Sequence, residues 1–256
     1  MFRFKKARTF EQHVEGAKMF DDVIEKFNPY HGKDGRFTSA NGAASFTYKP
    51  GASRAHDLAI TGAVARDAVA KAKAAEPKLT SDMQNLAKKY GGTMVGLEYA
   101  VKGAGSLRRK LNTEMNEIEA ATGKRPPASE VVKKMYDVNR YTMQGDEKNL
   151  ASMANGALKD LKGSGYEIVQ VKNTLWDDTA PYRGINCKLK SSDGAQIELQ
   201  FHTARSLEVK EVNHKLYETA RKDNTSAARR KQLNAEMAAN AKSIPTPDNI
   251  QSVGKI

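Results

Sequence analysis

Two stretches of alternating apolar and polar residues, joined by a short turn, constrain this chain more than any other feature. Over residues 195–202 the apolar side chains alternate with Glu198, Gln200 and His202, which is the period of a strand buried on one side. Residues 182–190 alternate in the same way. We therefore expect a β-hairpin with one buried face and one polar face.

The turn between these strands decides which residues face one another. A three-residue loop over 192–194, with a left-handed glycine at its end, places Lys188 opposite Glu198 and Asn186 opposite Gln200. A two-residue loop would shift the pairing by one residue and mix the faces. The first register predicts one common polar surface that carries Tyr182, Asn186, Glu198 and His202.

Composition sets the limits on fold and partners. With 256 residues, 39% of them hydrophobic, and a mean hydropathy of -0.66, the chain suits one compact domain with tails. Its net charge of +12 favours an anionic partner, which leaves nucleotide, nucleic acid and lipid headgroup open. The single cysteine, Cys187, excludes an internal disulfide and is compatible with a reducing cytoplasm. The sequence has no apolar run long enough to predict a membrane-spanning helix.

The order of predicted elements indicates an α/β or α+β fold, with a mixed sheet flanked by helices and an extended helical N-terminal region. Helices are expected over 10–27, 56–75, 81–90, 106–122, 150–162, 207–221 and 225–241, with strands over 138–143 and 166–171 before the hairpin. Pro77 separates the second helix from the third. The expected regions are an N-terminal helix and flexible linker (1–54), a helical region (55–91), a main domain (92–221), and a C-terminal helix and tail (222–256).

Four short motifs resemble the synthetase domain of the RelA/SpoT family. They are Lys102-x-x-x-Ser106-x-x-x-Lys110, Tyr182-x-x-x-Asn186, Glu198-x-Gln200 and Glu211-x-x-His214-x-x-Tyr217, in the family's order. They span a little under half of the chain and make the main domain synthetase-like. Known members of the family transfer the β,γ-pyrophosphate of ATP to a ribose 3′-hydroxyl. The resemblance implies the same reaction here, with Mg²⁺ and with a nucleotide or tRNA as acceptor.

The resemblance also assigns roles to residues. Lys102, Ser106 and Lys110 lie four apart, so on a helix they share a face that can meet a triphosphate; a solvated basic face has the same pattern. Tyr182 can stack on a base. The full nucleotide-binding set is Lys102, Ser106, Lys110, Tyr182, Asn186, Lys188, His202 and His214.

Glu198 is the first choice for a catalytic residue. Its carboxylate can coordinate Mg²⁺ and help to deprotonate an attacking hydroxyl, whereas Gln200 can only orient other groups. Asp137 is the second expected Mg²⁺ ligand, and Arg140 can neutralise charge on the transferring group, although a surface ion pair has the same pattern. In the family this arginine usually stands further from the aspartate.

Several positions depart from the family pattern and leave the acceptor open. Ala100 stands where a basic residue is usual, Asn186 where histidine is usual, and His202 where the long synthetases carry arginine. Glu211 and His214 are expected mainly to hold their helix against the sheet. The sequence shows no hydrolase region with clustered His and Asp. In this respect the chain resembles the small toxic members of the family, some of which modify the 3′ end of tRNA.

Residues 27–38 resemble a short element of bacteriophage and prophage head-associated proteins. This resemblance implies a phage- or prophage-borne toxin that acts in the host cytoplasm, with a possible link to the virion and a neutralising partner protein. Two alternatives stay open. One is a ribonuclease toxin that uses His202, His214, Glu198 and Tyr182 as an acid/base set. The other is a catalytically silent head or adaptor protein.

Overall fold

The computed structural model describes residues 54–180, 182–220 and 225–254. The helix predicted over 10–27 and the head-protein-like segment 27–38 lie outside these residues. Within the described ranges, no helix combines the length and apolar character that a membrane crossing requires.

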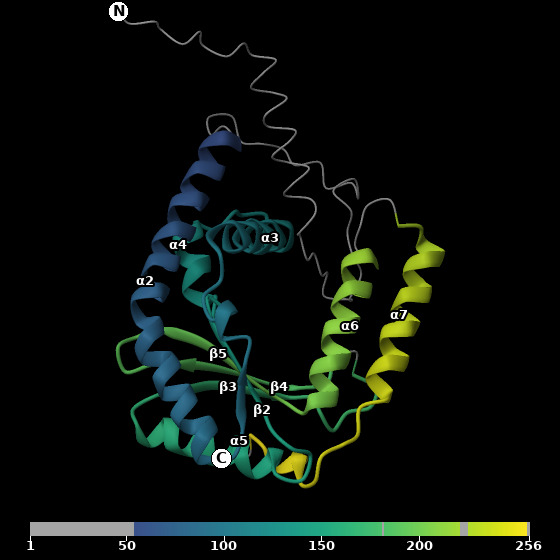
Figure 1. Ribbon diagram of the computed structural model, residues 1–256. Coiled ribbons are helices and arrows are strands. Elements are labelled where there is room, and N and C mark those ends of the chain that lie inside the picture. Colours follow the sequence, from purple (N-terminus) through teal and green to yellow (C-terminus); the bar gives the residue numbers. More distant parts are fainter. Residues whose placement is uncertain (1–53, 181, 221–224, 255–256) are drawn as a thin grey trace, which may run out of the picture.

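A mixed five-stranded sheet forms the centre of the fold (Figure 1). Its strands, in spatial order, are β1 (Thr93–Val95), β2 (Asn139–Gln144), β5 (Gln196–His202), β4 (Ile185–Lys190) and β3 (Glu167–Asn173). β2 and β5 run parallel, and the other neighbours are antiparallel. The predicted mixed sheet flanked by helices is confirmed.

The hairpin of β4 and β5 has the predicted register. Lys188 pairs with Glu198 and Asn186 pairs with Gln200. Gly194 is left-handed, with φ of 84°, and its N–H donates to the carbonyl of Ser191 at 2.9 Å. A side chain at this φ would be strained, so the glycine sets the loop length and thereby the pairing. The first strand of the hairpin begins only at residue 185, later than expected.

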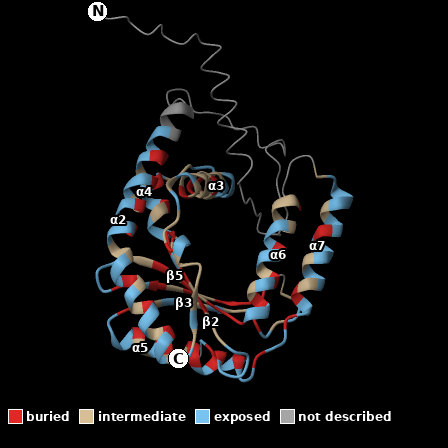
Figure 2. Ribbon diagram, viewed as in Figure 1, coloured by how far each residue is buried: buried red, intermediate tan, exposed pale blue. Residues whose placement is uncertain are grey.

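Helices cover the apolar face of the sheet with a continuous core. α5 (Leu150–Gly163) and the C-terminal half of α2 (Arg54–Lys89) pack there, and Figure 2 shows buried residues concentrated in the sheet and α5. The core residues include Leu79, Met83, Leu158, Ile185, Leu199 and Phe201. β5 therefore has its apolar side fully inside, which turns its polar residues to the opposite face.

A second apolar cluster joins α3 (Ala104–Thr122) to the N-terminal half of α2 and to α4 (Ala128–Val131). Short 3₁₀ turns, η1 (Leu97–Tyr99) and η2 (Val132–Lys134), connect these helices to the strands. Figure 1 shows α3 on the side of the sheet away from α5, together with α6 (Ala204–Ala220). The polar face of the sheet thus lies beneath α3 and α6.

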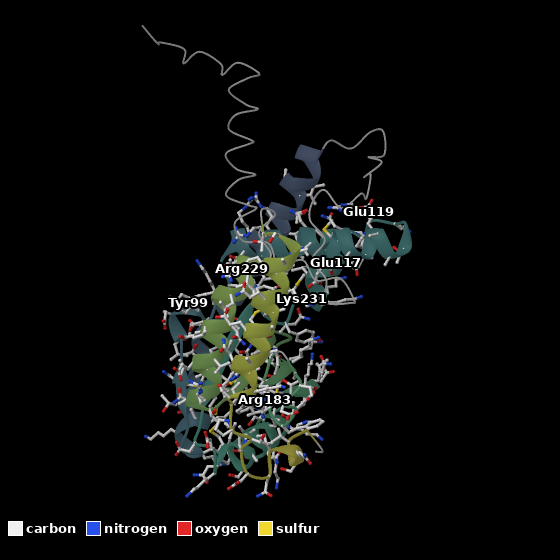
Figure 3. All side chains as sticks on the ribbon, turned by 90° about the vertical axis from the view of Figure 1, so that its right-hand side faces the viewer. Tyr99, Glu117, Glu119, Arg183, Arg229 and Lys231 are labelled. Carbon is white, nitrogen blue, oxygen red and sulfur yellow. The ribbon has the colours of Figure 1, made fainter. Side chains whose placement is uncertain are left out.

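The C-terminal segment is anchored by a buried arginine. It comprises α7 (Ala227–Lys242) and η3 (Ile250–Ser252), and its residues Ile250 and Val253 belong to the main core. The guanidinium of Arg183 donates to the carbonyls of Leu175, Ala241 and Ile244 and to Thr246 Oγ1. In Figure 3 Arg183 lies well below Arg229 and Lys231, which belong to the first half of α7.

In the N-terminal half, one expectation was wrong and one strand was missed. The helices predicted over 56–75 and 81–90 are one helix, α2, which continues through Pro77. Leu79 and Met83, just beyond the proline, are both buried. Burial of two such side chains is worth about 3–6 kcal/mol, which offsets the roughly 3 kcal/mol cost of a proline in a helix interior. The first strand, β1, was not predicted because three residues are too few to show a period.

Replacing Pro77 with alanine should stabilise the protein. The substitution restores a helical hydrogen bond and removes a steric clash, for a gain of roughly 3 kcal/mol, less about 1 kcal/mol for the greater entropy of the unfolded chain. Urea denaturation should show the free energy of unfolding rising by about 2 kcal/mol. Lys73→Ala, at an exposed position of the same helix, should change it by less than about 0.5 kcal/mol. A loss of stability in Pro77→Ala would contradict a continuous helix.

Candidate active site

A hydrogen-bonded carboxylate stands in the middle of the polar face. Glu198 Oε1 accepts from Asn186 Nδ2 at 2.8 Å, and Glu198 Oε2 accepts from Gln200 Nε2 at 2.9 Å. A carboxylate oxygen accepts hydrogen bonds, so these two amide donors hold the side chain in one orientation. The predicted surface of Asn186, Glu198 and Gln200 is therefore a bonded unit.

Cations flank this carboxylate on both neighbouring strands. Arg140 on β2 and Lys188 on β4 are the register partners of Glu198. Arg140 Nε donates to the carbonyl of Tyr99 at 3.0 Å, and Lys188 Nζ lies 5.8 Å from the centroid of the Tyr136 ring. The sheet thus places a guanidinium on one side of Glu198 and an ammonium on the other.

A second cluster joins two predicted lysines to the predicted aspartate. Asp137 Oδ2 accepts from Lys102 Nζ at 2.6 Å and lies 2.9 Å from Lys110 Nζ. Asp137 Oδ1 is buried without a hydrogen-bond partner. The N–H of Lys102 donates to the carbonyl of Val138 at 2.9 Å. This backbone bond brings Lys102 beside the aspartate.

The expected helical face of Lys102, Ser106 and Lys110 is wrong in detail. α3 begins at Ala104, so Lys102 lies in the extended segment before it. Ser106 Oγ accepts a hydrogen bond from Arg109 Nη2 at 2.9 Å instead of joining the aspartate. Gly103 is the residue just before α3, and Gly105 lies within its first turn.

The groups of this cluster shift one another's pKa values. Burial alone would raise the pKa of Asp137, but the charges and hydrogen bonds of Lys102 and Lys110 together lower it to about 2. Burial lowers the pKa of Lys102, and Asp137 only partly opposes this change. Lys110 Nζ also lies 3.9 Å from Glu114 Oε1, so the two lysines share two carboxylates.

Electrostatic coupling links the two clusters into one site. Burial lowers the pKa of both Lys102 and Lys210, and the charge of Arg140 lowers each of them further. Burial raises the pKa of Glu114 on α3, while Lys188 on β4 is among the cations that lower it. Groups from α3, β2, β4 and α6 therefore share one electrostatic environment.

The predicted stacking residue Tyr182 is tied to a buried histidine. Tyr182 Oη and His202 Nε2 are 2.9 Å apart, and the two rings meet edge to face at 5.7 Å between centroids. His202 Nδ1 lies 2.8 Å from Ser206 Oγ on α6. His202 has no exposed surface, and burial, with a smaller effect of Lys210, lowers its pKa to about 3. Both ring nitrogens have a hydroxyl partner, so the neutral ring is satisfied in either tautomer.

Gly184 makes this contact possible. A Cβ at position 184 would lie 2.5 Å from His202 Cε1 and 2.7 Å from Tyr182 Oη, which is too close for either atom. The glycine in the Tyr182–Asn186 motif is therefore required by packing.

The helix after β5 behaves differently from expectation. Glu211 and His214 are exposed, so they do not hold α6 against the sheet; His214 Nε2 lies 3.6 Å from Glu218 on the same helix. Buried Val209 and Ser206 do so instead. His214 as a nucleotide ligand stays a prediction.

Sequence reasoning missed Lys210 and Arg183. Lys210 Nζ donates to Gln200 Oε1 at 2.6 Å. The available signal was its spacing: one turn after Ser206 and one turn before His214, on a helix that directly follows the carboxylate strand. Arg183 left no comparable signal, because its acceptors are mostly backbone carbonyls of a distant segment.

The carboxylates suit Mg²⁺ only together with phosphate. Among the described residues, no three His, Cys, Asp or Glu side chains gather as a metal site. Mg²⁺ is usually held by one or two carboxylates with waters and substrate phosphates. Asp137, with its unpartnered Oδ1, and Glu198 fit that mode.

A separate cavity of about 670 Å³ lies between α2 and α5, on the other side of the sheet. Its charged groups are largely paired with one another, including Lys78 with Asp82 and Lys89 with Asp160. None of the predicted site residues lines it. It is therefore distinct from the candidate active site.

Comparison with known proteins gives matches in structure alone. No protein-family model matches the chain, and no curated protein matches it in sequence. The type VI effector Tas1, solved with its immunity protein, is 17% identical with a TM-score of 0.43, over 70% of this chain and 95% of that chain. Small alarmone synthetase 2 from Bacillus subtilis is 15% identical with a TM-score of 0.46, over 69% of this chain and 90% of that one.

Small alarmone synthetase 1 from Bacillus subtilis, bound to its product pppGpp, is 13% identical with a TM-score of 0.44, over 66% of this chain and 87% of that one. At these identities and scores the likeness does not establish a shared activity. The function has to be argued from the side chains.

Gly184→Ala should separate Tyr182 from His202 and lower the free energy of unfolding by about 1–3 kcal/mol, as overpacking of a buried site does. Thermal unfolding measures the loss, and near-UV circular dichroism should show the changed tyrosine environment. Gly163→Ala is the matched control, since a Cβ at that position meets no atom within 4 Å. Equal stability of the two variants would contradict the close contact.

Asp137 should make stability depend on pH in acid. Its pKa is lowered from 3.8 to about 2, so its contribution is present above about pH 4 and is lost as the pH falls towards 2. The shift corresponds to about 2 kcal/mol. The difference in unfolding free energy between wild type and Asp137→Asn should shrink by that amount between pH 5 and pH 2. Asp248→Asn, at an exposed position, should show no such change.

Proposed function

We propose that this chain transfers the β,γ-pyrophosphate of ATP to a ribose 3′-hydroxyl. The observation that carries the proposal is the Glu198 carboxylate, which two amides hold in place between cations on one polar sheet face. Phosphoryl transfer needs little covalent chemistry from the protein and depends on positioning and charge stabilisation. The cations that supply this are Lys102, Lys110, Arg140 and Lys188.

Each group then has a chemical task. The 3′-hydroxyl oxygen attacks the β-phosphorus of ATP while Glu198 takes the hydroxyl proton. The bond from the β-phosphorus to the oxygen that bridges it to the α-phosphorus breaks, and AMP leaves with the electron pair. Arg140 and Lys188, on either side of Glu198, offset the negative charge that develops on the transferring group. Gln200 and Asn186 keep the carboxylate in place.

The lysine–aspartate cluster suits the triphosphate. Lys102 and Lys110 place two ammonium groups beside the Asp137 carboxylate. The start of α3 lies beside them, and no side chain caps its N-terminus. Backbone N–H groups at a helix start favour phosphate. A Cβ at Gly103 would meet no atom within 4 Å, which is consistent with open space at that end.

Mg²⁺ is proposed to arrive with ATP and to be held by Asp137 and Glu198. When bound, it would neutralise phosphate charge and polarise the transferring group. The acceptor is proposed to be a nucleotide or the 3′ end of tRNA, with Tyr182 near its base. Burial and, to a smaller extent, the negative charge of Glu198 raise the pKa of Tyr182, which is consistent with a position near this carboxylate.

We further propose a toxin-type role that a partner protein neutralises. Tas1, one of the structural matches, is an effector solved with its immunity protein. The phage or prophage origin and the link to a virion rest on residues 27–38 alone and stay predictions.

The structure removes His202 from the acid/base set of the ribonuclease alternative. Such an enzyme needs an accessible imidazole that exchanges protons near neutral pH. His202 has no exposed surface, and burial lowers its pKa to about 3. It therefore carries no proton to give to a leaving group at neutral pH.

Incubation with γ-labelled ATP and Mg²⁺, with GDP, GTP, ADP or tRNA as separate acceptors, tests the reaction class. Label should move to one of these acceptors in the wild type. Glu198→Gln keeps the size of the side chain but cannot take the proton, so transfer should fall by roughly 10²–10⁴-fold. The controls are Glu147→Gln and Lys190→Ala, at exposed positions away from the cluster.

Undiminished transfer in Glu198→Gln would remove Glu198 from the mechanism. Absence of transfer to every acceptor, with RNA cleaved instead, would favour the ribonuclease class.

A further inference from the structure

Lys210 on α6 is linked to the Glu198 carboxylate through a third side chain, that of Gln200. Lys210 Nζ donates to Gln200 Oε1 at 2.6 Å, and Gln200 Nε2 donates to Glu198 Oε2 at 2.9 Å. The three side chains form an unbroken chain of hydrogen bonds from the helix to the strand. None of the predicted roles included Lys210.

The chemistry of the three groups allows only one orientation of the amide. An ammonium has donors and no acceptor, and an ionised carboxylate has acceptors and no donor. The amide of Gln200 has one end of each kind, so its oxygen must face Lys210 and its nitrogen must face Glu198. Rotating the amide by half a turn would set oxygen against oxygen at Glu198 and N–H against N–H at Lys210.

Glu198 by itself already favours the nitrogen end of the amide, because a carboxylate cannot donate to the oxygen end. Without a donor at its far end, however, the amide can turn away from Glu198 towards solvent. Lys210 therefore helps to keep the second hydrogen bond of Glu198 in place. The bond from Asn186 to Glu198 Oε1 does not depend on this choice, because it comes from β4.

The position of Lys210 is itself fixed by neighbouring residues of α6. Val209 is buried in the main core, and Ser206, one turn earlier, bonds to Thr203 and meets His202. Asn213, one turn later, donates to the carbonyl of Met237 on α7. The lysine consequently projects from a well-packed turn, and its own atoms are partly buried.

Charges of both signs surround Lys210. Burial is the largest influence on its pKa and lowers it; Arg140 acts in the same direction, while Glu198 and Glu211 oppose the change. Gln200 supplies a direct hydrogen-bond acceptor, and Glu198 supplies negative charge beyond it.

We propose that Lys210 is a positioning residue for the transfer reaction: it orients Gln200, and through Gln200 it holds the Glu198 carboxylate in its reactive orientation. This inference rests on the proposed function, because it concerns the same carboxylate. It goes further by assigning a task to a residue outside the four motifs, and by predicting that this task is exercised only through Gln200.

A double-mutant cycle tests the route of action. Lys210→Met keeps the length of the side chain and removes its donors. It should lower kcat about tenfold, with the KM for ATP changed less than about twofold, because a positioning loss acts on the reaction step. In a Gln200→Leu background the same substitution should cause no further loss, since the link is already broken. Lys210→Arg, which keeps the donors, should recover part of the activity.

Other results would overturn the inference. One such result is that the kcat losses of the two single variants multiply in the double variant, with a raised KM for ATP in both backgrounds. That result would show that Lys210 contacts phosphate directly. A loss of kcat that Lys210→Arg does not relieve, together with a lowered melting temperature, would show a purely structural role. Lys215→Met, on the exposed side of the same helix, is the control and should keep the kcat of the wild type.

A measurement without turnover separates failure of this inference from failure of the proposed function. The side-chain amide signals of Gln200 in a ¹⁵N–¹H spectrum can be assigned by their loss in Gln200→Leu. They should move and exchange faster with water in Lys210→Met but not in Lys215→Met. If the wild type transfers no pyrophosphate, the proposed function fails, while this comparison still decides whether Lys210 holds Gln200. Unchanged amide signals in Lys210→Met would overturn the link.

Discussion

The candidate site depends on β5 having one apolar side and pairing with a neighbour on each edge. Leu199 and Phe201 are fully buried, and this burial forces Glu198 and Gln200 to the opposite face. A slip of one residue would place a carboxylate in the core, at a cost of several kcal/mol. The strand is therefore locked in register by its apolar side chains. The functional groups are placed as a consequence.

The same strand register determines which charged residues lie beside Glu198. Because β2 is parallel to β5 and β4 is antiparallel to it, Arg140 and Lys188 become its two lateral partners. Two residues far apart in the sequence are thereby brought to one carboxylate by backbone pairing alone. The loop before β2 then adds Asp137. This aspartate pairs with Lys110 of α3 and with Lys102 in the segment before that helix. Sheet topology therefore assembles the cation-rich surface from several parts of the chain.

How far the sequence could predict this arrangement depended on whether the determinant was local. The hairpin register followed from a period of two and from one glycine, Gly194, and both were visible in the sequence. The continuity of α2 through Pro77 was not visible, because it depends on the burial of Leu79 and Met83 against distant strands. A local rule for proline was outweighed by tertiary packing.

The site residues divide in the same way. Glu198, Asn186 and Gln200 were grouped correctly because strand alternation alone puts them on one face. The helical face of Lys102 and Lys110 was wrong, yet both lysines reach Asp137, because the backbone pairing of Lys102 with Val138 does what the helix was expected to do. Lys210 was missed because its role requires knowing that α6 crosses above Gln200.

The predictions for Tyr182 and His202 show what a sequence motif cannot predict. A motif specifies residue types but not what lies behind them. Tyr182 and His202 were predicted to share an exposed polar surface, whereas Gly184 leaves room for them to pack together and Ser206 hydrogen-bonds to the buried imidazole. His202 is thereby removed from solvent and kept neutral, so its chemistry is that of a hydrogen-bond partner. If Tyr182 meets an acceptor base, the orientation of its ring is set by this buried neighbour, which connects the base subsite to the same helix that carries Lys210.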